Sequence, residues 1–233
     1  MSQGIFITAT ATDAGKTYVS AGLLKQLLSE GIHAGYYKAA ASDAHRVDGN
    51  WLADDLDTVQ SISGVDKESS FVSYTYHSGV SPHLAAVLEQ RPIERSVIEN
   101  DLQRMKDTHD FLIVEGSGGI VCPLRLDEEC IMLSDVMRMS GFALLIVADA
   151  GLGTINSCML SVHYAQQLHI PIAGFLLNHY HDSNQLHQDN KKTIELLSGY
   201  PVLGCLADNE PVHLNLQRLF PYTGQWKPSA CSF

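Results

Sequence analysis

The sequence lacks several features that would set it apart from ordinary globular proteins. No apolar run approaches the about 18 residues that a membrane-spanning helix needs, and the longest run, residues 142–148, has the length of a strand. The N-terminus has no basic region and no long apolar region, so we expect no signal peptide. Acidic residues outnumber basic ones by 26 to 15. The resulting net charge of -11 argues against a general nucleic-acid binder, although a phosphate ligand needs only a local cradle. We therefore expect neither a nucleic-acid partner nor a membrane partner.

Cysteine is scarce, and no two cysteines form a C-x-x-C pair. The five cysteines are Cys122, Cys130, Cys158, Cys205 and Cys231. An odd number without paired spacing is typical of reduced cysteines, so we expect a cytoplasmic protein.

Two catalytic signatures are also missing. The sequence has no G-x-S-x-G elbow of the kind that carries hydrolase chemistry. His179, His181 and His187 do not have a recognised metal-ligand spacing, and we expect them on the surface.

Apolar runs alternate with helical patterns along the 233 residues. The expected strands cover residues 4–8, 33–37, 111–114, 143–147, 172–177 and 202–206. The expected helices cover residues 18–29, 51–61, 82–89, 94–108, 133–139, 154–168, 186–198 and 212–219. Continuous apolar strands between helices predict a mostly parallel α/β sheet with helices on both faces. With no repeat and no linker, we expect residues 1–233 to form a single doubly wound domain.

The first expected strand leads into a loop, residues 10–17, that ends in Gly-Lys-Thr and precedes an amphipathic segment. A strand, a tight loop and a helix in this order make a phosphate cradle, because backbone N–H groups point at the phosphate oxygens. Gly15 lets the backbone approach closely, Lys16 adds positive charge, and the Thr17 hydroxyl can bind Mg²⁺. The strict motif has Gly where this chain has Thr10, so an ordinary strand-to-helix turn is the alternative.

Polar and glycine-rich segments follow the other expected strands. They are residues 38–42, 115–119 and 149–156, and Asn178. In doubly wound sheets, ligands bind at the carboxyl ends of the strands. We therefore expect these segments to converge on one rim with the phosphate loop.

Charged residues on this rim suggest its chemistry. Lys16 and Lys38 together favour an anionic substrate or a phosphoryl transition state, although Lys38 alone could equally be a solvent-facing lysine. Glu115 is positioned like a carboxylate that holds Mg²⁺. One of Asp54, Asp55 and Asp57 could be a second carboxylate, with the others on a solvated face.

The segment 151–156 opens a helix with a glycine-rich turn. It lacks the third glycine of a dinucleotide-binding loop, so we do not expect NAD. The free N–H groups of such a turn can bind a carboxylate.

These motifs in this order resemble dethiobiotin synthetase over approximately residues 4–210. The matching segments are residues 12–17, 34–42, 81–83, 114–119 and 151–156, and Asn178. The resemblance implies a P-loop NTPase-like fold and a homodimeric ligase that needs ATP and Mg²⁺. Such enzymes close the ureido ring of dethiobiotin from 7,8-diaminononanoate (7,8-diaminopelargonate) and CO₂, in biotin biosynthesis. The path implied runs through a carbamate and a carbamic-phosphoric anhydride.

The resemblance also implies residue roles. The catalytic residues would be Lys16, Lys38 and Ser42. The nucleotide would contact Asp13, Ala14, Gly15, Lys16, Thr17, Tyr18, Asp55, Glu115, Gly116, Ser117, Gly118, Asn178, Ala207 and Asp208. The metal ligands would be Thr17, Asp55 and Glu115. The diamine would contact Thr12, Ser42 and Gly118, and its carboxylate tail would reach Thr154, Ile155 and Asn156 of the partner subunit.

The sequence departs from the family at the front of the phosphate loop. The family usually has Gly at Ala9, an acidic residue at Ala11 and Glu at Asp13. It often has Pro after the last strand, where this chain has Ala207 and Asp208, so nucleotide choice could be relaxed. The alternative function is a P-loop ATPase switch of the partition or site-placement type. A third possibility, a corrin side-chain amidase, normally adds a glutamine-hydrolysing domain for which 233 residues leave no room.

Overall fold

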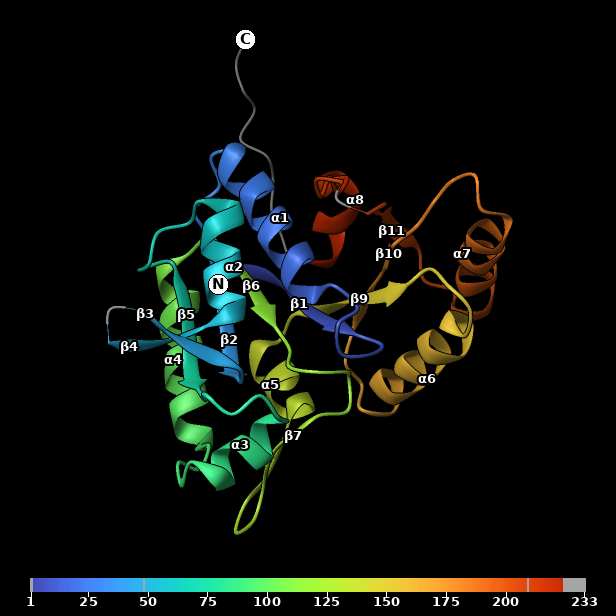
Figure 1. Ribbon diagram of the computed structural model, residues 1–233. Helices are drawn as coiled ribbons and strands as arrows, with labels where there is room; N and C mark the ends of the chain where they lie inside the picture. Colours follow the sequence, from blue (N-terminus) through green and yellow to red (C-terminus); the bar gives the residue numbers. More distant parts are fainter. Residues whose placement is uncertain (1, 48, 209, 224–233) are drawn as a thin grey trace.

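Seven parallel strands form the central sheet, in the order β11-β10-β9-β1-β6-β2-β5. The computed structural model describes residues 2–47, 49–208 and 210–223 (Figure 1). The strands are β1 (Gln3–Ala9), β2 (Ala34–Ala41), β5 (Ser70–Thr75), β6 (Phe111–Glu115), β9 (Ala143–Asp149), β10 (Ile172–Asn178) and β11 (Val202–Cys205). Because β1 pairs with both β6 and β9, the loop after β1 emerges near the middle of the sheet.

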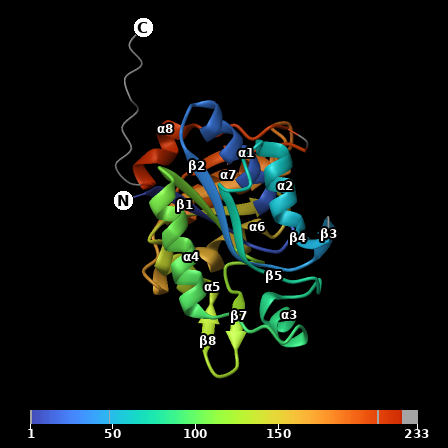
Figure 2. The same cartoon turned by 90° about the vertical axis from the view of Figure 1, so that its left-hand side faces the viewer.

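Helices cover both faces of this sheet (Figures 1 and 2). They are α1 (Lys16–Ser29), α2 (Asp54–Ser63), α3 (Pro82–Leu88), α4 (Arg95–Thr108), α5 (Leu133–Ser140), α6 (Thr154–Gln167), α7 (Gln185–Ser198) and α8 (Leu216–Leu219), followed by the 3₁₀ turn η1 (Phe220–Tyr222). One buried cluster joins the sheet to α1, α2 and α8, and the other joins it to α3 through α7. The predicted doubly wound α/β fold is thus confirmed.

Several predicted element boundaries were wrong. Residues 51–53 belong to the strand β4 (Asn50–Ala53), which pairs with β3 (Ala44–Val47), so the helix expected over 51–61 begins only at Asp54. The helix expected over 212–219 is reduced to α8. The second strand runs on to Ala41 and therefore contains Lys38 instead of ending before it.

Three further strand features were not predicted. The edge strand β5 carries several half-buried residues, and its sequence SFVSYT lacks the continuous apolar run that marked the other strands. The hairpins β3–β4 and β7–β8 are short, and each strand spans four residues or fewer; β7 is Pro123–Leu126 and β8 is Cys130–Met132.

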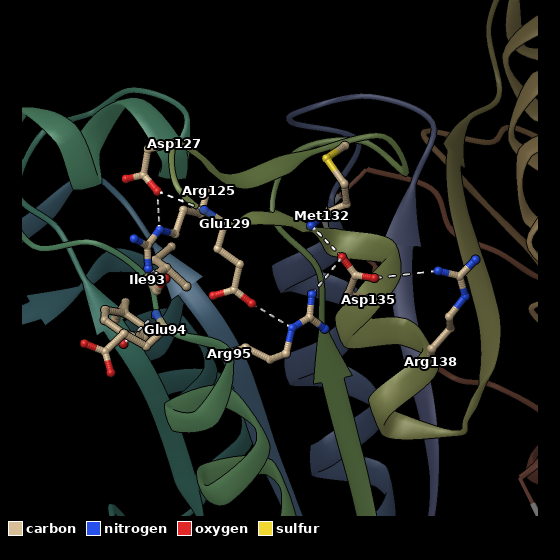
Figure 3. A network of polar contacts seen from close by, with 10 residues as sticks. Ile93, Glu94, Arg95, Arg125, Asp127, Glu129, Met132, Asp135 and Arg138 are labelled. Atoms are coloured by element: carbon tan, nitrogen blue, oxygen red, sulfur yellow. Dashed lines mark hydrogen bonds and ion pairs between the residues drawn. The ribbon is translucent and has the colours of Figure 1, made fainter.

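The hairpin β7–β8 is fixed by a network of charged side chains (Figure 3). Arg95 of α4 donates through Nε to Glu129 Oε1 at 2.9 Å, and its guanidinium lies 3.7 Å from Asp135 of α5. Asp135 also accepts the backbone N–H of Met132 at 2.8 Å.

Candidate functional site

The loop after β1 leads into α1 through Gly15, which has a φ of 96°. A Cβ built at Gly15 would lie 2.4 Å from Nδ2 of Asn178, so no larger residue fits without movement. Asn178 Nδ2 donates to the carbonyl of Ala14 at 3.1 Å and thereby fixes the loop against the end of β10. The first turn of α1 has neither an acidic residue nor a side-chain cap. Its N-terminal N–H groups and helix dipole therefore favour an anion.

Four side chains from four elements meet beside this loop. Lys38 of β2 lies with its Nζ 2.6 Å from Asp55 Oδ2 and 2.8 Å from Glu115 Oε1. Thr17 Oγ1 lies 2.8 Å from Asp55 Oδ1 and 2.9 Å from Glu115 Oε1, and its single proton can serve one of them at a time. Lys38 and Glu115 are opposite each other in the register of β2 and β6. The structure thus separates Asp55 from Asp54 and Asp57, which are exposed.

Burial and charge act together on the two lysines. Burial lowers the pKa of Lys38, but the charges of Glu115 and Asp55 outweigh it, so the pKa is raised and the ammonium is retained. Burial, followed by the charge of Lys38, lowers the pKa of Lys16. Lys16 has no ion pair among the described residues. An anion bound at this loop would therefore stabilise the charged form of Lys16.

A cavity of about 780 Å³ opens in front of these groups. Its lining combines the phosphate loop, Lys38, Asp55 and the segment after β2 with Ser117, Gly118 and Cys122. Asp43, Cys122 and residues 79–82 were not among the predicted site residues, although residues 81–83 carried part of the resemblance. Asp43 directly follows the predicted Ser42, but its charge alone gave no reason to single it out.

The remaining predicted residues of the glycine-rich loop after β6 shape the wall of the site. Ser117 Oγ donates to the carbonyl of Ala40 at 2.6 Å, which ties this loop to β2. Gly118 has a φ of 62°, and a Cβ at Gly116 would lie 2.9 Å from Leu133. Thr12, Asp13, Tyr18 and Ser42 all line the cavity.

A second set of predicted residues does not line this cavity. Thr154, Ile155 and Asn156 form the first turn of α6, Asn178 is the last residue of β10, and Ala207 and Asp208 follow β11. Ala14, Glu115 and Gly116 are not lining residues either, although Glu115 contacts Lys38 and Thr17, which are. Asp208 is within ion-pair distance of His179 and His181, at 3.8 Å and 3.5 Å. His179 and His181 are exposed, whereas the expectation for His187 was wrong. His187 is buried, and its Nδ1 accepts the backbone N–H of His181 at 3.0 Å.

The donor set at Thr17 suits a small divalent cation. Thr17, Asp55 and Glu115 offer only oxygen atoms, and Oε2 of Glu115 is buried without a hydrogen-bond partner in the described part of the chain. Mg²⁺ typically takes one or two carboxylates together with phosphate and water oxygens. Among the described residues no group of three or more His, Cys, Asp or Glu side chains could hold a metal by itself. The residues present thus fit Mg²⁺ bound together with a nucleotide.

Two further properties concern the chain as a whole. Cys122, Cys130, Cys158 and Cys205 are free, and Cys231 lies outside the described residues. Within 2–47, 49–208 and 210–223, no helix has the length and apolarity to cross a bilayer.

Comparison with known sequences gives consistent names. A family model described as an AAA domain matches residues 3–214. A protein from Clostridium botulinum (strain Loch Maree / Type A3), named ATP-dependent dethiobiotin synthetase BioD, is 40% identical over 223 residues, which are 95% of this chain and 98% of the relative. A protein of the same name from Brachyspira hyodysenteriae is 42% identical over 209 residues, covering 89% and 93% of the two chains.

Comparison with solved structures shows the fold alone. A ParA family ATPase from Chlorobium tepidum aligns with a TM-score of 0.56 and 16% identity, over 96% of this chain and 91% of the other. A chain of the MinC:MinD cell division protein complex of Aquifex aeolicus aligns with a TM-score of 0.56 and 14% identity, over 90% and 82%. These identities are too low to carry function.

Proposed function

The chain belongs to the dethiobiotin synthetase family, and we propose that it closes the ureido ring of dethiobiotin from 7,8-diaminononanoate, CO₂ and ATP. The observation that carries this proposal is Lys38, a residue of β2 that is held between Asp55 and Glu115 beside the phosphate loop. A buried ammonium beside a phosphate cradle suits a reaction in which a carbamate and a phosphoryl group meet.

The proposed reaction has three steps. One amine of the diamine adds to CO₂, loses a proton and becomes a carbamate. A carbamate oxygen then attacks the γ-phosphorus of ATP, ADP leaves, and a carbamic-phosphoric anhydride forms. The second amine attacks the carbamoyl carbon, the C–O bond to phosphate breaks, and a proton is released. The substrate supplies both nucleophiles, so the protein contributes positioning and charge.

The phosphate loop and the two lysines would carry the phosphoryl transfer. Backbone N–H groups from Asp13 to Tyr18 would hold the phosphates, and Lys16 would contact the β- and γ-phosphates. Lys38 would contact the carbamate and the transferring group. Thr17, Asp55 and Glu115 would hold Mg²⁺, which neutralises phosphate charge when bound. Ser117 and Gly118, which line the cavity, and the adjacent Gly116 would close the same wall.

The diamine would occupy the part of the cavity beside Ser42. Ser42, Thr12 and Gly118 all line the cavity and would contact the carbamate or the diamine chain. Asn178, Ala207 and Asp208 would hold the adenine ring, since Asn178 adjoins the phosphate loop.

We infer a homodimer in which the substrate's carboxylate reaches Thr154, Ile155 and Asn156 of a second copy. Those residues lie outside the cavity of their own chain, which supports a role in another copy. The turn before them carries Leu152, which is 91% exposed, as an apolar contact for that copy would be. We also propose that residues 1–233 act as one domain and that the protein is cytoplasmic, which the four free cysteines support.

The test is to incubate the protein with diaminononanoate, bicarbonate, Mg²⁺ and ATP and to measure dethiobiotin. We expect one ADP and one phosphate for each dethiobiotin. No dethiobiotin, with a known synthetase active in a parallel reaction, would refute the proposal. The alternative of a partition-type ATPase switch rests on the fold only. It predicts ATP hydrolysis without a diamine-dependent product.

A further inference from the structure

Six buried side-chain polar atoms lack a hydrogen-bond partner in the described part of the chain. Two of them, the hydroxyl of Tyr36 and Oε2 of Glu115, lie on the neighbouring strands β2 and β6 that also carry Lys38 and the proposed metal ligand. Tyr36 is 0% exposed and Glu115 is 1% exposed, so bulk water does not serve either atom. An unpaired buried polar group is costly, and a phenylalanine would avoid that cost at position 36. The hydroxyl therefore calls for an explanation.

The register of the sheet brings these two groups together. Tyr36 and Lys38 are two residues apart on β2 and share one face, while Glu115 lies opposite Lys38 on β6. Tyr36 belongs to the buried cluster beneath α1 and α2, the two helices that supply Thr17 and Asp55. Burial, then the charges of Glu115 and Asp55, and then a side-chain contact with Glu115, raise the pKa of the Tyr36 hydroxyl. The phenol thus lies near the Glu115 carboxylate, although the pair does not have the geometry of a full hydrogen bond.

The other carboxylate oxygen of Glu115, Oε1, is paired with two donors that would turn toward other partners during the reaction. Oε1 receives the Lys38 ammonium at 2.8 Å and lies 2.9 Å from the Thr17 hydroxyl. In the proposed function Lys38 turns toward the carbamate and the Thr17 hydroxyl turns toward the metal. Glu115 would then lose both donors at the moment when its orientation matters most. A phenol on the neighbouring strand β2 can supply a donor that stays in place.

We propose that Tyr36 is a positioning residue, whose hydroxyl donates to Oε2 of Glu115 and holds that carboxylate toward Mg²⁺ when the nucleotide is bound. The proposal rests on the metal ligands assigned under the proposed function. Hydrogen bonds that orient a metal ligand typically change metal affinity by about 10- to 100-fold.

The neighbouring tyrosine offers a matched control. Tyr37 is also 0% exposed, but it belongs to the cluster on the opposite face, and its hydroxyl is 2.9 Å from Ser73 Oγ. Tyr36→Phe removes a hydroxyl without a partner, and Tyr37→Phe removes one with a partner. The two variants should therefore have opposite effects on stability and on metal dependence.

The experiment titrates Mg²⁺ against binding of a fluorescent ATP analogue to the full chain, together with thermal unfolding. We expect Tyr36→Phe to raise the Mg²⁺ concentration for half-maximal binding at least tenfold without lowering the unfolding midpoint. Tyr37→Phe should lower the midpoint and leave the Mg²⁺ dependence unchanged. In a Glu115→Ala background, Tyr36→Phe should have little further effect on Mg²⁺ dependence, because the proposed acceptor is absent.

Three outcomes would overturn the inference. An unchanged Mg²⁺ dependence in Tyr36→Phe would make the hydroxyl only an unpartnered core group. A full additional effect in the Glu115→Ala background would show that Tyr36 acts through another group. The same comparison decides the question if Tyr36→Phe also lowers the unfolding midpoint, because an effect that comes only from lost stability would persist without Glu115. If the unsubstituted protein binds the nucleotide without any Mg²⁺ dependence, the metal site of the proposed function fails first, and this inference fails with it.

Discussion

The ammonium of Lys38 lies 2.8 Å from Oε1 of Glu115, and both side chains are almost completely shielded from solvent. Glu115 is also one of the proposed metal ligands, so the lysine and a metal would share the same carboxylate. A buried pair of this kind stabilises the fold only while both partners remain. Charge supplied by Mg²⁺ would leave Lys38 free to contact an anionic substrate.

Replacing this lysine should therefore affect catalysis and stability together. We expect Lys38→Met to lower turnover by about a hundredfold or more, because a charge contact to the transition state is lost. The variant should also unfold at a lower temperature, because Glu115 stays buried without its ion-pair partner. Steady-state dethiobiotin formation and thermal unfolding measure the two effects. Lys25→Met, at an exposed position of α1, is the control. If Lys38→Met has the same turnover as this control, Lys38 has no catalytic role.

A substitution at Gly15 tests the phosphate loop. The Cβ of Gly15→Ala would meet Nδ2 of Asn178 at 2.4 Å, on a backbone with a φ of 96°. We expect nucleotide affinity to fall at least tenfold, measured by isothermal titration calorimetry. Gly31→Ala is the control, because Gly31 has a φ of 76° and a Cβ built there has no atom within 4 Å. This control measures only the cost of the backbone conformation, which is about 1 kcal/mol. Equal losses of affinity in both variants would argue against a specific role for the loop.

The decrease of the free energy of unfolding at acidic pH should depend on Asp55. Burial would raise the pKa of Asp55, but the charge of Lys38 and the hydrogen bonds from Lys38 and Thr17 outweigh it and lower the pKa. A lowered pKa means that the carboxylate stabilises the fold above its ordinary pKa of about 4, and that this contribution disappears as the pH falls through the lowered value. The stability difference between the unsubstituted protein and Asp55→Asn should thus shrink from pH 7 to pH 3 in urea unfolding. A difference that stays constant would contradict the ion pair.

Cys122 provides a chemical probe inside the cavity. Burial raises the pKa of its thiol to about 11, so at pH 8 only about one thiol in a thousand is ionised. We expect iodoacetamide to modify the exposed Cys130 much faster, as mapped by mass spectrometry with Cys130→Ser as the control. The rate at Cys122 should rise about tenfold per pH unit up to about pH 11 and fall when Mg²⁺ and ATP are added. Fast modification of Cys122 at pH 8 would contradict the buried environment.

A substitution in α7 tests the proposed role of the loop before α6. Asn190 Nδ2 donates to the carbonyls of Ala150 and Gly151 at 2.9 Å and 3.0 Å, and thereby holds the turn that is proposed to receive the substrate's carboxylate. We expect Asn190→Ala to raise KM for the diamine severalfold while KM for ATP stays constant. Asn184→Ala removes the cap of α7 and controls for general destabilisation of that helix. An equal rise in both KM values would point to a global defect.

The parts of the fold that the sequence predicted are those with a strong local signal. The buried parallel strands form continuous apolar runs, and the loop ending in Gly-Lys-Thr is marked by its residues. The edge strand β5 has no such run. The choice of Asp55 over Asp54 and Asp57 depends on how α2 faces β2, which no local pattern encodes. The sequence likewise gives no local signal for Tyr36, because its proposed role depends on Glu115 on a neighbouring strand.

The most direct test of the central claim follows the oxygen atoms of CO₂. If a carbamate oxygen attacks the γ-phosphorus and leaves with phosphate, bicarbonate labelled with ¹⁸O should transfer one ¹⁸O to phosphate for each dethiobiotin formed. The measurement is mass spectrometry of both products after a short reaction with diaminononanoate, Mg²⁺ and ATP. The account predicts singly labelled phosphate in step with dethiobiotin. Dethiobiotin accompanied by unlabelled phosphate, or phosphate release without dethiobiotin, would contradict it.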